Sequence, residues 1–229
     1  MEQLEGFLLV APILLFSMVA HEYAHGYAAL RQGDPTARDL GRLSWNPARH
    51  IDPVLTILLP IITFFGSGMR FAFGGAKPIP VDPSRYRHYR RGDIIVSLAG
   101  VAANLVVALL CALVVVLAGQ AGRTVVGAAG PLRTLQTMML YGIMINFSLI
   151  GFNLLPVPPL DGSHVVKHLL PPAWAIRYQQ FGRRYGMLLL ILLIGIGRGV
   201  IDAWMRPAFA ATDALIRAVS PYALGARVL

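Results

Sequence analysis

The sequence predicts an all-α polytopic membrane protein with about four to six transmembrane or re-entrant helices. Hydrophobic residues make up 56% of the 229 residues and charged residues only 14%, which is too apolar for an ordinary soluble domain. The mean hydropathy is +0.62. No internal repeat or low-complexity linker interrupts the chain, so residues 1–229 are expected to form a single integral-membrane domain.

Five apolar runs account for the expected helices. Four of them reach the roughly 20 residues that cross a hydrocarbon core, namely residues 4–30, 93–119, 134–156 and 184–204. The fifth, residues 51–66, is shorter and contains Pro53 and Pro60, which disfavour an uninterrupted helix. This run is interpreted as either a re-entrant helix or a full crossing, so the number of helices stays between four and six.

A short extended hairpin is expected near residues 71–82, after the fifth run. Phenylalanine and β-branched residues are interspersed there with glycines and prolines, a composition typical of a strand and turn rather than a helix. Such backbone is tolerated at membrane depth only where it packs against protein or lines a water-filled cavity. A plain cytoplasmic loop is the alternative.

The basic residues are distributed unevenly among the loops. They gather in residues 31–91 and 157–183, whereas the 120–133 loop has only Arg123 and Arg133. By the positive-inside rule the two basic regions face the cytoplasm. Because no organelle signal is visible, the chain is expected in a prokaryotic cell (inner) membrane. The net charge of +9 is scattered and forms no single stripe, which argues against nucleic acid as a partner.

The sequence His21-Glu22-Tyr23-Ala24-His25 lies near the cytoplasmic end of the first run. Residues four apart share a helical face, so the two imidazoles can hold one zinc ion. Glu22, next to the first of them, can reach a water molecule on that ion and act as a base. Ionisable side chains are costly inside an apolar segment, which favours a functional site over a chance match.

Catalytic zinc usually has three protein ligands, and Asp161 is the best candidate for the third. It follows the 134–156 run and a stretch of prolines that must break the helix. If residues 31–91 return to the cytoplasmic side, the ends of the first and third long runs lie on the same side. His21, His25 and Asp161 can then meet. An ordinary Asp-Gly turn is the alternative.

Four motifs stand out along the chain: HEYAHG from residue 21, FGGAKPIPVDP at 73–83, SLAGVAANL at 97–105 and NLLPVPPLDG at 153–162. Together they resemble the site-2 protease family of intramembrane metalloproteases, most of all its compact branch without a PDZ domain. The last motif departs from the family pattern, because many members have Asn-Pro where this chain has Asn-Leu-Leu-Pro.

The resemblance implies a zinc-dependent endopeptidase that hydrolyses peptide bonds in or near transmembrane segments of membrane protein substrates, within the lipid bilayer. It assigns one zinc ion per chain to His21, His25 and Asp161, with Glu22 as the catalytic base. The active site is then expected towards the cytoplasmic side.

By the same resemblance Asn153 contacts substrate or the oxyanion, and Asn104 fits a second family asparagine. The core is expected over residues 1–170, with a C-terminal helix and interfacial tail over 180–229. A lone Asn104 in an apolar helix has an alternative role, because it can bond a neighbouring helix.

Two other classes of protein compete with the protease. A catalytically inactive membrane adaptor of the same fold would have no need of Glu22. A metal transporter would need a relay of acidic or histidine residues across the membrane, and the 93–119 and 184–204 runs offer almost none. A second histidine pair, His164 and His168, is interpreted as part of a solvated cytoplasmic helix.

Overall fold

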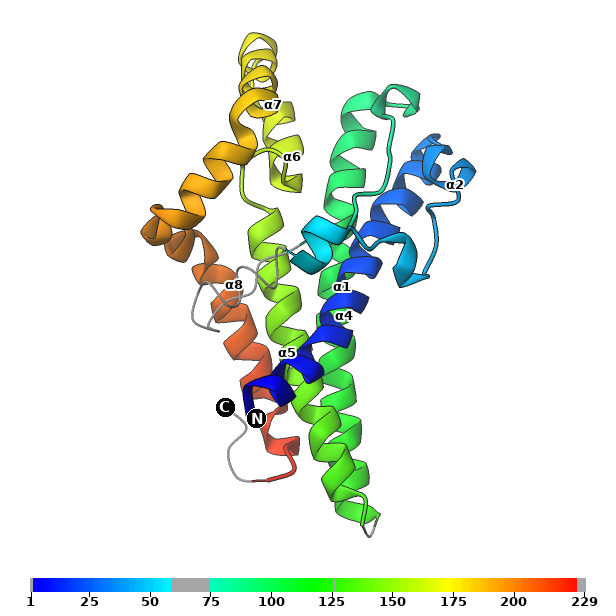
Figure 1. The fold of residues 1–229 in the computed structure, drawn as a ribbon, viewed down its shortest axis with the longest axis vertical. Coiled ribbons are helices and arrows are strands. Elements are labelled where there is room, and N and C mark those ends of the chain that lie inside the picture. Colours follow the sequence, from blue (N-terminus) through cyan, green and yellow to red (C-terminus); the bar gives the residue numbers. More distant parts are fainter. Residues whose placement is uncertain (1, 59–74, 126, 226–229) are drawn as a thin grey trace. The chain divides into compact units, whose positions relative to one another are not determined.

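The computed structural model describes residues 2–58, 75–125 and 127–225, which fold almost entirely into helices (Figure 1). The α-helices are α1 (Glu2–Gln32), α2 (Thr36–Asp39), α4 (Tyr89–Thr124), α5 (Ala129–Asn153), α6 (Asp161–Leu169), α7 (Pro172–Gly195) and α8 (Arg198–Val219). Short helical turns cover Pro47–Arg49, Pro53–Leu58, Pro83–Arg85 and Ser220–Tyr222. No strand occurs within the described ranges, so the all-α prediction is confirmed for them.

Three of these helices are long and apolar enough to cross a membrane: Leu8–Gln32, α4 and α5. They correspond to the predicted runs 4–30, 93–119 and 134–156. The predicted run 184–204 is instead divided between α7 and α8, which meet at a bend of 84° and count as a fourth span only if the pair is one. Most of the 51–66 run falls on residues 59–74, outside the described residues.

The bend between α7 and α8 has a local cause in the sequence. Gly195, Gly197 and Gly199 alternate there with Ile196 and Arg198, and glycine is a poor helix former. Gly197 lies between the two helices as the residue preceding α8. Length and hydropathy therefore predicted the apolar character of this run but not its division into two helices.

The short extended hairpin expected near residues 71–82 is not seen in its described part, residues 75–82. Residues 75–82 have no regular secondary structure, and they pair with no strand in the described part of the chain. Pro78 and Pro80 have no N–H to donate, so this stretch cannot form a regular ladder of hydrogen bonds. Residues 71–74 lie outside the described residues.

The chain divides into two compact units, Met1–Gly100 and Val101–Leu229, with the boundary inside α4. In the first unit α1 packs against the beginning of α4 through Ala29, Tyr86 and Val96. A β-carbon at Gly92 would lie 2.8 Å from the β-carbon of Tyr86, so only glycine allows this approach. The beginning of α4 is thereby held against the end of α1 that carries the histidines.

The turn that follows α1 is closed by Asp34, which is fully buried. Its carboxylate accepts hydrogen bonds from the Thr36 N–H at 3.0 Å, from the Thr36 hydroxyl, and from the Asp82 N–H at 2.6 Å. A further bond of 2.8 Å joins the Arg87 N–H to the Gln32 carbonyl. Residues 82–87 are therefore fixed to the end of α1.

In the second unit α5 and α8 pack closely around Gly151. A β-carbon there would lie 2.8 Å from the Met205 sulfur and 2.9 Å from the Ala208 β-carbon. The Trp204 indole N–H donates to the Gly151 carbonyl at 2.9 Å. Glycine near the end of α5 is thus required by the close approach of α8.

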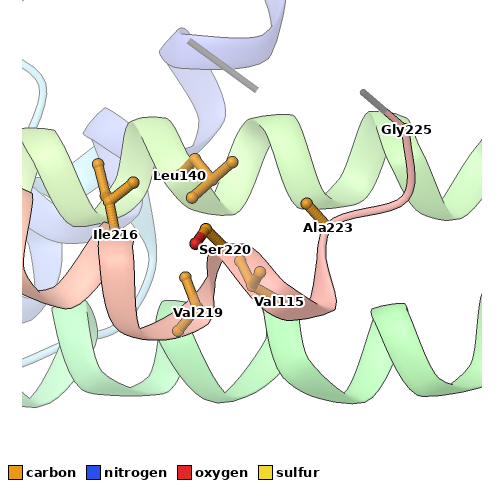
Figure 2. Close-up of a pocket in the computed structure, with 7 residues that line it drawn as sticks. All are labelled: Val115, Leu140, Ile216, Val219, Ser220, Ala223 and Gly225. Carbon is orange, nitrogen blue, oxygen red and sulfur yellow. The ribbon is translucent and has the colours of Figure 1, made fainter. Parts of the chain in front are cut away.

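The other end of this unit encloses a cavity of about 220 Å³ (Figure 2). Its lining comes from α4, α5, α8 and the turn beyond α8: Val115, Leu140, Ile216, Val219, Ser220, Ala223 and Gly225. The one hydroxyl in this set, that of Ser220, already donates to the Arg217 carbonyl at 2.9 Å. The lining has no titratable side chain, so this cavity is not a candidate for the chemistry.

Candidate metal centre and active site

The two histidines of the HExxH sequence converge in the first unit. His21 and His25 lie one turn apart on α1, and each is only 9% exposed. Their Nε2 atoms are 2.9 Å apart, with the rings nearly perpendicular at 83°. A zinc ion binds imidazole nitrogen at about 2.0–2.1 Å. The two nitrogens therefore approach one point in the way that a shared metal ion requires.

The main chain of α4 fixes the orientation of His25. The His25 Nδ1 atom lies 2.7 Å from the Val96 carbonyl oxygen, which can only accept, so Nδ1 carries the proton. In the neutral ring Nε2 then keeps its lone pair. Ligating histidines usually donate their other ring N–H in this way, and the bond fixes both the tautomer and the ring plane. The donor set thus fits a metal ion.

Gly100, one turn beyond Val96, makes room for both rings. A β-carbon at this position would lie 2.5 Å from His21 Cε1 and 2.5 Å from His25 Nε2. Atoms that are not bonded do not approach so closely, so any side chain would displace the rings. Gly100, in the SLAG part of the 97–105 motif, therefore provides the space in which the two histidine rings pack.

The Glu22 carboxylate is hydrogen-bonded by residues 75–82 and not by its own helix. Its Oε2 atom accepts a hydrogen bond of 2.7 Å from the Ile79 N–H. Ile79 lies between Pro78 and Pro80, which have no N–H, so it carries the single amide donor of the three residues. One carboxylate oxygen of Glu22 is thus oriented by the main chain.

The Ile79 side chain is buried and determines where that N–H lies. Its Cδ1 atom occupies the space that a β-carbon of Gly26 would need, and the same space borders Leu43 at 3.1 Å and Ala37 at 3.3 Å. Gly26 is one turn beyond Glu22 on α1. A missing side chain on α1 therefore admits the residue that orients Glu22.

Further hydrogen bonds fasten the rest of the segment. The Arg42 guanidinium donates to the Lys77 carbonyl at 3.1 Å and to the Pro78 carbonyl at 3.2 Å. The Lys77 N–H donates to the His50 carbonyl at 2.8 Å, and the Thr56 hydroxyl to the Gly75 carbonyl at 2.7 Å. Residues 75–82 are thus bound at both ends and in the middle.

Asp161 belongs to the second unit, where it is the first residue of α6. A carboxylate in the first turn of a helix is favoured by the helix dipole. A β-carbon at Gly162 would collide with the Leu154 carbonyl, so glycine is required for the chain to turn back here. The Asp-Gly sequence is therefore a turn and a helix start together.

The two asparagines predicted as substrate contacts have different surroundings. Asn104 is fully buried, and its amide donates to the Asn146 side chain at 3.1 Å, joining α4 to α5. Asn146, also buried, donates to the Gly142 carbonyl at 2.8 Å. Asn153 is partly exposed at the end of α5 and donates to the Leu149 carbonyl at 3.0 Å. The helix-bonding alternative thus describes Asn104.

The helix that carries His164 and His168 is less solvated than predicted. Lys167, between them, is only 7% exposed, and Gly162 and Ser163 are buried. The expectation of a solvated helix is therefore wrong for this face of α6. The expectation rested on Lys167, which adjoins His168, and a lysine stem can lie buried along apolar surface.

Sequence reasoning did not single out four residues that the structure gives a role: Val96, Gly100, Ile79 and Asn146. A signal existed for two of them. Asn146 is a polar residue within an apolar run, and Ile79 is the one N–H donor between two prolines. The other two act through a main-chain carbonyl and a missing side chain, which no residue type reveals.

A buried histidine pair with an adjacent glutamate, carried on an apolar helix that can span a membrane, defines the class of this protein: an integral membrane metalloprotease. Comparisons identify the family. Residues 120–193 match the description "Peptidase family M50". The chain is 34% identical over 198 residues to "Putative zinc metalloprotease YwhC" of Bacillus subtilis (strain 168), covering 86% of this chain and 84% of the relative. The chain belongs to peptidase family M50, the site-2 protease family.

Two mycobacterial relatives are also similar. "Putative zinc metalloprotease Rip2" of Mycolicibacterium smegmatis is 32% identical over 191 residues, 82% of this chain and 67% of the relative. The protein of the same name from Mycobacterium tuberculosis is 27% identical over 166 residues, 72% of this chain and 59% of the relative. No solved structure matches the chain.

Proposed function

We propose that this metalloprotease is an intramembrane zinc endopeptidase, which hydrolyses peptide bonds in or near transmembrane segments of membrane proteins. The observation that carries the proposal is the convergence of the His21 and His25 Nε2 atoms, 2.9 Å apart, on an apolar helix long enough to cross a membrane. A water-soluble protease has no need to keep its metal ligands within such a helix.

We assign one zinc ion per chain to His21, His25 and Asp161. A catalytic zinc typically has three protein ligands and an open position, and two histidines with one carboxylate are a common set. Asp161 supports the assignment by its chemistry and by its place in the NLLPVPPLDG motif. Relatives over most of the chain are named as zinc metalloproteases, which agrees with this metal.

Glu22 is the proposed general base. A zinc ion in this site would supply a Lewis acid that polarises the scissile carbonyl and acidifies a water molecule. Glu22 takes the proton of the attacking water and returns it to the leaving amide nitrogen. The Ile79 N–H holds one of its oxygens, which leaves the other free to take part in proton transfer. Asn153, which is partly exposed, can donate to the oxyanion.

The substrate helix must be unwound before cleavage, because its carbonyls are hydrogen-bonded within the helix. Residues 75–82 are the proposed contact for the unwound strand, through isolated main-chain hydrogen bonds, because Pro78 and Pro80 exclude a regular edge pairing. A prokaryotic cell membrane with the active site on its cytoplasmic side is the proposed location, because the loops next to the ligands are rich in arginine.

Elemental analysis of the detergent-purified protein tests the proposal most directly. We expect about one zinc per chain in the wild type, and loss of that zinc in both His21→Ala and Asp161→Ala. Zinc retained in Asp161→Ala would remove the third ligand from the proposal. Metal-loaded Glu22→Gln protein that still cleaves a transmembrane substrate at the wild-type rate would remove the base. Absence of zinc from the wild type would favour the adaptor.

A further inference from the structure

One face of α7 follows the segment that leads to Asp161. Tyr178, Gly182, Gly186 and Leu190 recur every four residues and so form a single stripe on this helix. Each of them contacts the stretch between α5 and α6, residues 154–160. Since Asp161 comes directly after this stretch, the stripe determines the position from which its side chain starts.

The two glycines of the stripe form a groove for Pro158. A β-carbon at Gly182 would overlap the Pro158 ring, lying 2.8 Å from its Cβ atom and closer still to its Cγ atom. A β-carbon at Gly186 would instead overlap the Pro158 carbonyl, lying 3.0 Å from its carbon and closer still to its oxygen. The first glycine therefore accommodates a side chain and the second a main chain.

Contacts on either side of the groove extend the match. Beyond Gly182, the Tyr178 hydroxyl donates to the Pro156 carbonyl at 2.9 Å. Beyond Gly186, Leu190 is buried in a cluster with three apolar side chains of the segment: Leu155, Val157 and Leu160. Four consecutive turns of α7 thus bind the segment by a hydrogen bond, two close approaches and an apolar cluster.

The spacing Gly182-x-x-x-Gly186 in a helix of this kind usually indicates packing against another helix. Here the groove is occupied by the protein's own proline-rich segment. A groove already filled in this way is not free to bind a second transmembrane helix. Its role must therefore be sought in what the segment carries.

We propose that α7 is the positioning element of Asp161, with Tyr178, Gly182 and Gly186 as the positioning residues. The proposal rests on the proposed function, because it needs Asp161 to be a zinc ligand. Zinc sites tolerate errors of only about 0.2 Å in ligand distance. A segment with three prolines, whose own backbone hydrogen bonds are limited to turns at its two ends, cannot reach that accuracy alone, and α7 supplies the missing constraint. Residues beyond the expected 1–170 core thus belong to the active site.

Zinc affinity, measured by competition with a chelator on purified protein, tests the proposal. We expect Gly186→Ala and Gly182→Ala to weaken zinc binding by about 10-fold to 100-fold, the usual effect of losing a group that orients a metal ligand. Gly195→Ala on the same helix and Gly199→Ala on α8 are matched controls, since a β-carbon at either meets nothing within 4 Å. Both controls should bind zinc like the wild type.

Rescue by a second substitution separates positioning from general stability. Pro158→Ala removes the Cγ atom, which lies nearest to a side chain at position 182, and keeps the Cβ atom at 2.8 Å, so it should restore part of the zinc affinity of Gly182→Ala. It leaves the carbonyl that collides at position 186, so it should not restore Gly186→Ala. A melting temperature measured for every variant shows which of them are folded.

Tyr178→Phe keeps the test decisive if the glycine variants do not fold. It removes only the hydroxyl that binds the Pro156 carbonyl, and we expect several-fold weaker zinc binding with an unchanged melting temperature. Tyr185→Phe, at an exposed position of the same helix, is its control.

Unchanged zinc affinity in the folded variants would overturn the positioning role, provided that Asp161→Ala does lose zinc. Zinc retained in Asp161→Ala would instead overturn the ligand assignment of the proposed function. Equal rescue of both glycine variants by Pro158→Ala would also contradict the proposal, because the two collisions involve different atoms.

Discussion

The histidine pair and Asp161 are supported in different ways. His21 and His25 lie within an apolar helix, and α4 adds a carbonyl at Val96 and an empty space at Gly100. Asp161 follows a stretch of prolines, and its support comes from α7, a helix later in the chain. The two histidines take their spacing from a regular helix, and a neighbouring helix only orients their rings. A ligand at a break in the chain needs a separate element to hold it.

The largest effect is expected from Glu22→Gln, which removes the base and leaves both kinds of support intact. We expect kcat for a transmembrane substrate to fall by about 10²-fold to 10⁴-fold, the usual contribution of a general base. Zinc content should stay at the wild-type value. A variant that loses its zinc would mean that Glu22 supports the metal site rather than the proton transfer.

Gly100→Ala breaks the support of the histidine pair without changing a ligand. Its methyl group would need the space of His25 Nε2 and His21 Cε1, so both rings must move. We expect about 10²-fold lower activity and reduced zinc content, because a ligand misplaced by about 1 Å costs that much. Gly130→Ala, which meets nothing within 4 Å, is the control. Wild-type zinc binding in Gly100→Ala would show that the space beside Gly100 is not needed for the histidine rings.

Ile79→Ala tests the hydrogen bond from the Ile79 N–H to the Glu22 carboxylate. Losing the buried side chain should loosen the N–H that binds the carboxylate, and we expect kcat to fall by about 10-fold with KM and zinc content unchanged. Ile79→Val should restore most of the rate. Val81→Ala, at an exposed position of the same segment, is the comparison. A rise in KM alone would assign Ile79 to substrate binding instead.

The smallest expected effect is on stability and concerns Tyr86, which is buried in one cluster with Ala29 and Val96. Burial raises the pKa of the Tyr86 hydroxyl, and the nearby carboxylates of Asp93, Asp34 and Asp82 raise it further. The folded state therefore keeps a proton that the unfolded state releases near pH 10. This contribution to stability is fully present below pH 10 and is lost as the pH rises above it.

Tyr86→Phe should remove this part of the pH dependence. The hydroxyl has no hydrogen-bond partner in the described part of the chain, so we expect a change of about 1 kcal/mol or less at pH 7. Denaturant unfolding of both proteins at pH 7 and above pH 10 measures the difference. If both proteins lose the same amount of stability between pH 7 and a pH above 10, the pH dependence arises from groups other than Tyr86.

Much of the fold and part of the candidate site follow from local sequence patterns. The three long spans were predicted because apolar length decides which helices can cross a bilayer. The histidine pair was predicted because i and i+4 share a helical face whatever the helix packs against. Both patterns act within one segment, so tertiary contacts do not alter them.

The remainder depends on contacts between distant segments. The bend at Gly197 divides a run that looks continuous by hydropathy. Ile79 reaches Glu22, 57 residues away, and Tyr178 reaches Pro156 on another element. Such contacts arise from packing and from missing side chains, and a single sequence gives no direct measure of either. The role of α7 is therefore a result of the structure alone.

The prolines on both sides of Ile79 have a consequence for alignment. A displacement of residues 75–82 by one position in either direction would bring a proline nitrogen opposite Glu22, and that nitrogen has nothing to donate. Of these three registers, only the observed one satisfies the carboxylate. A segment displaced by one residue would therefore lack the bond that holds the aligned one.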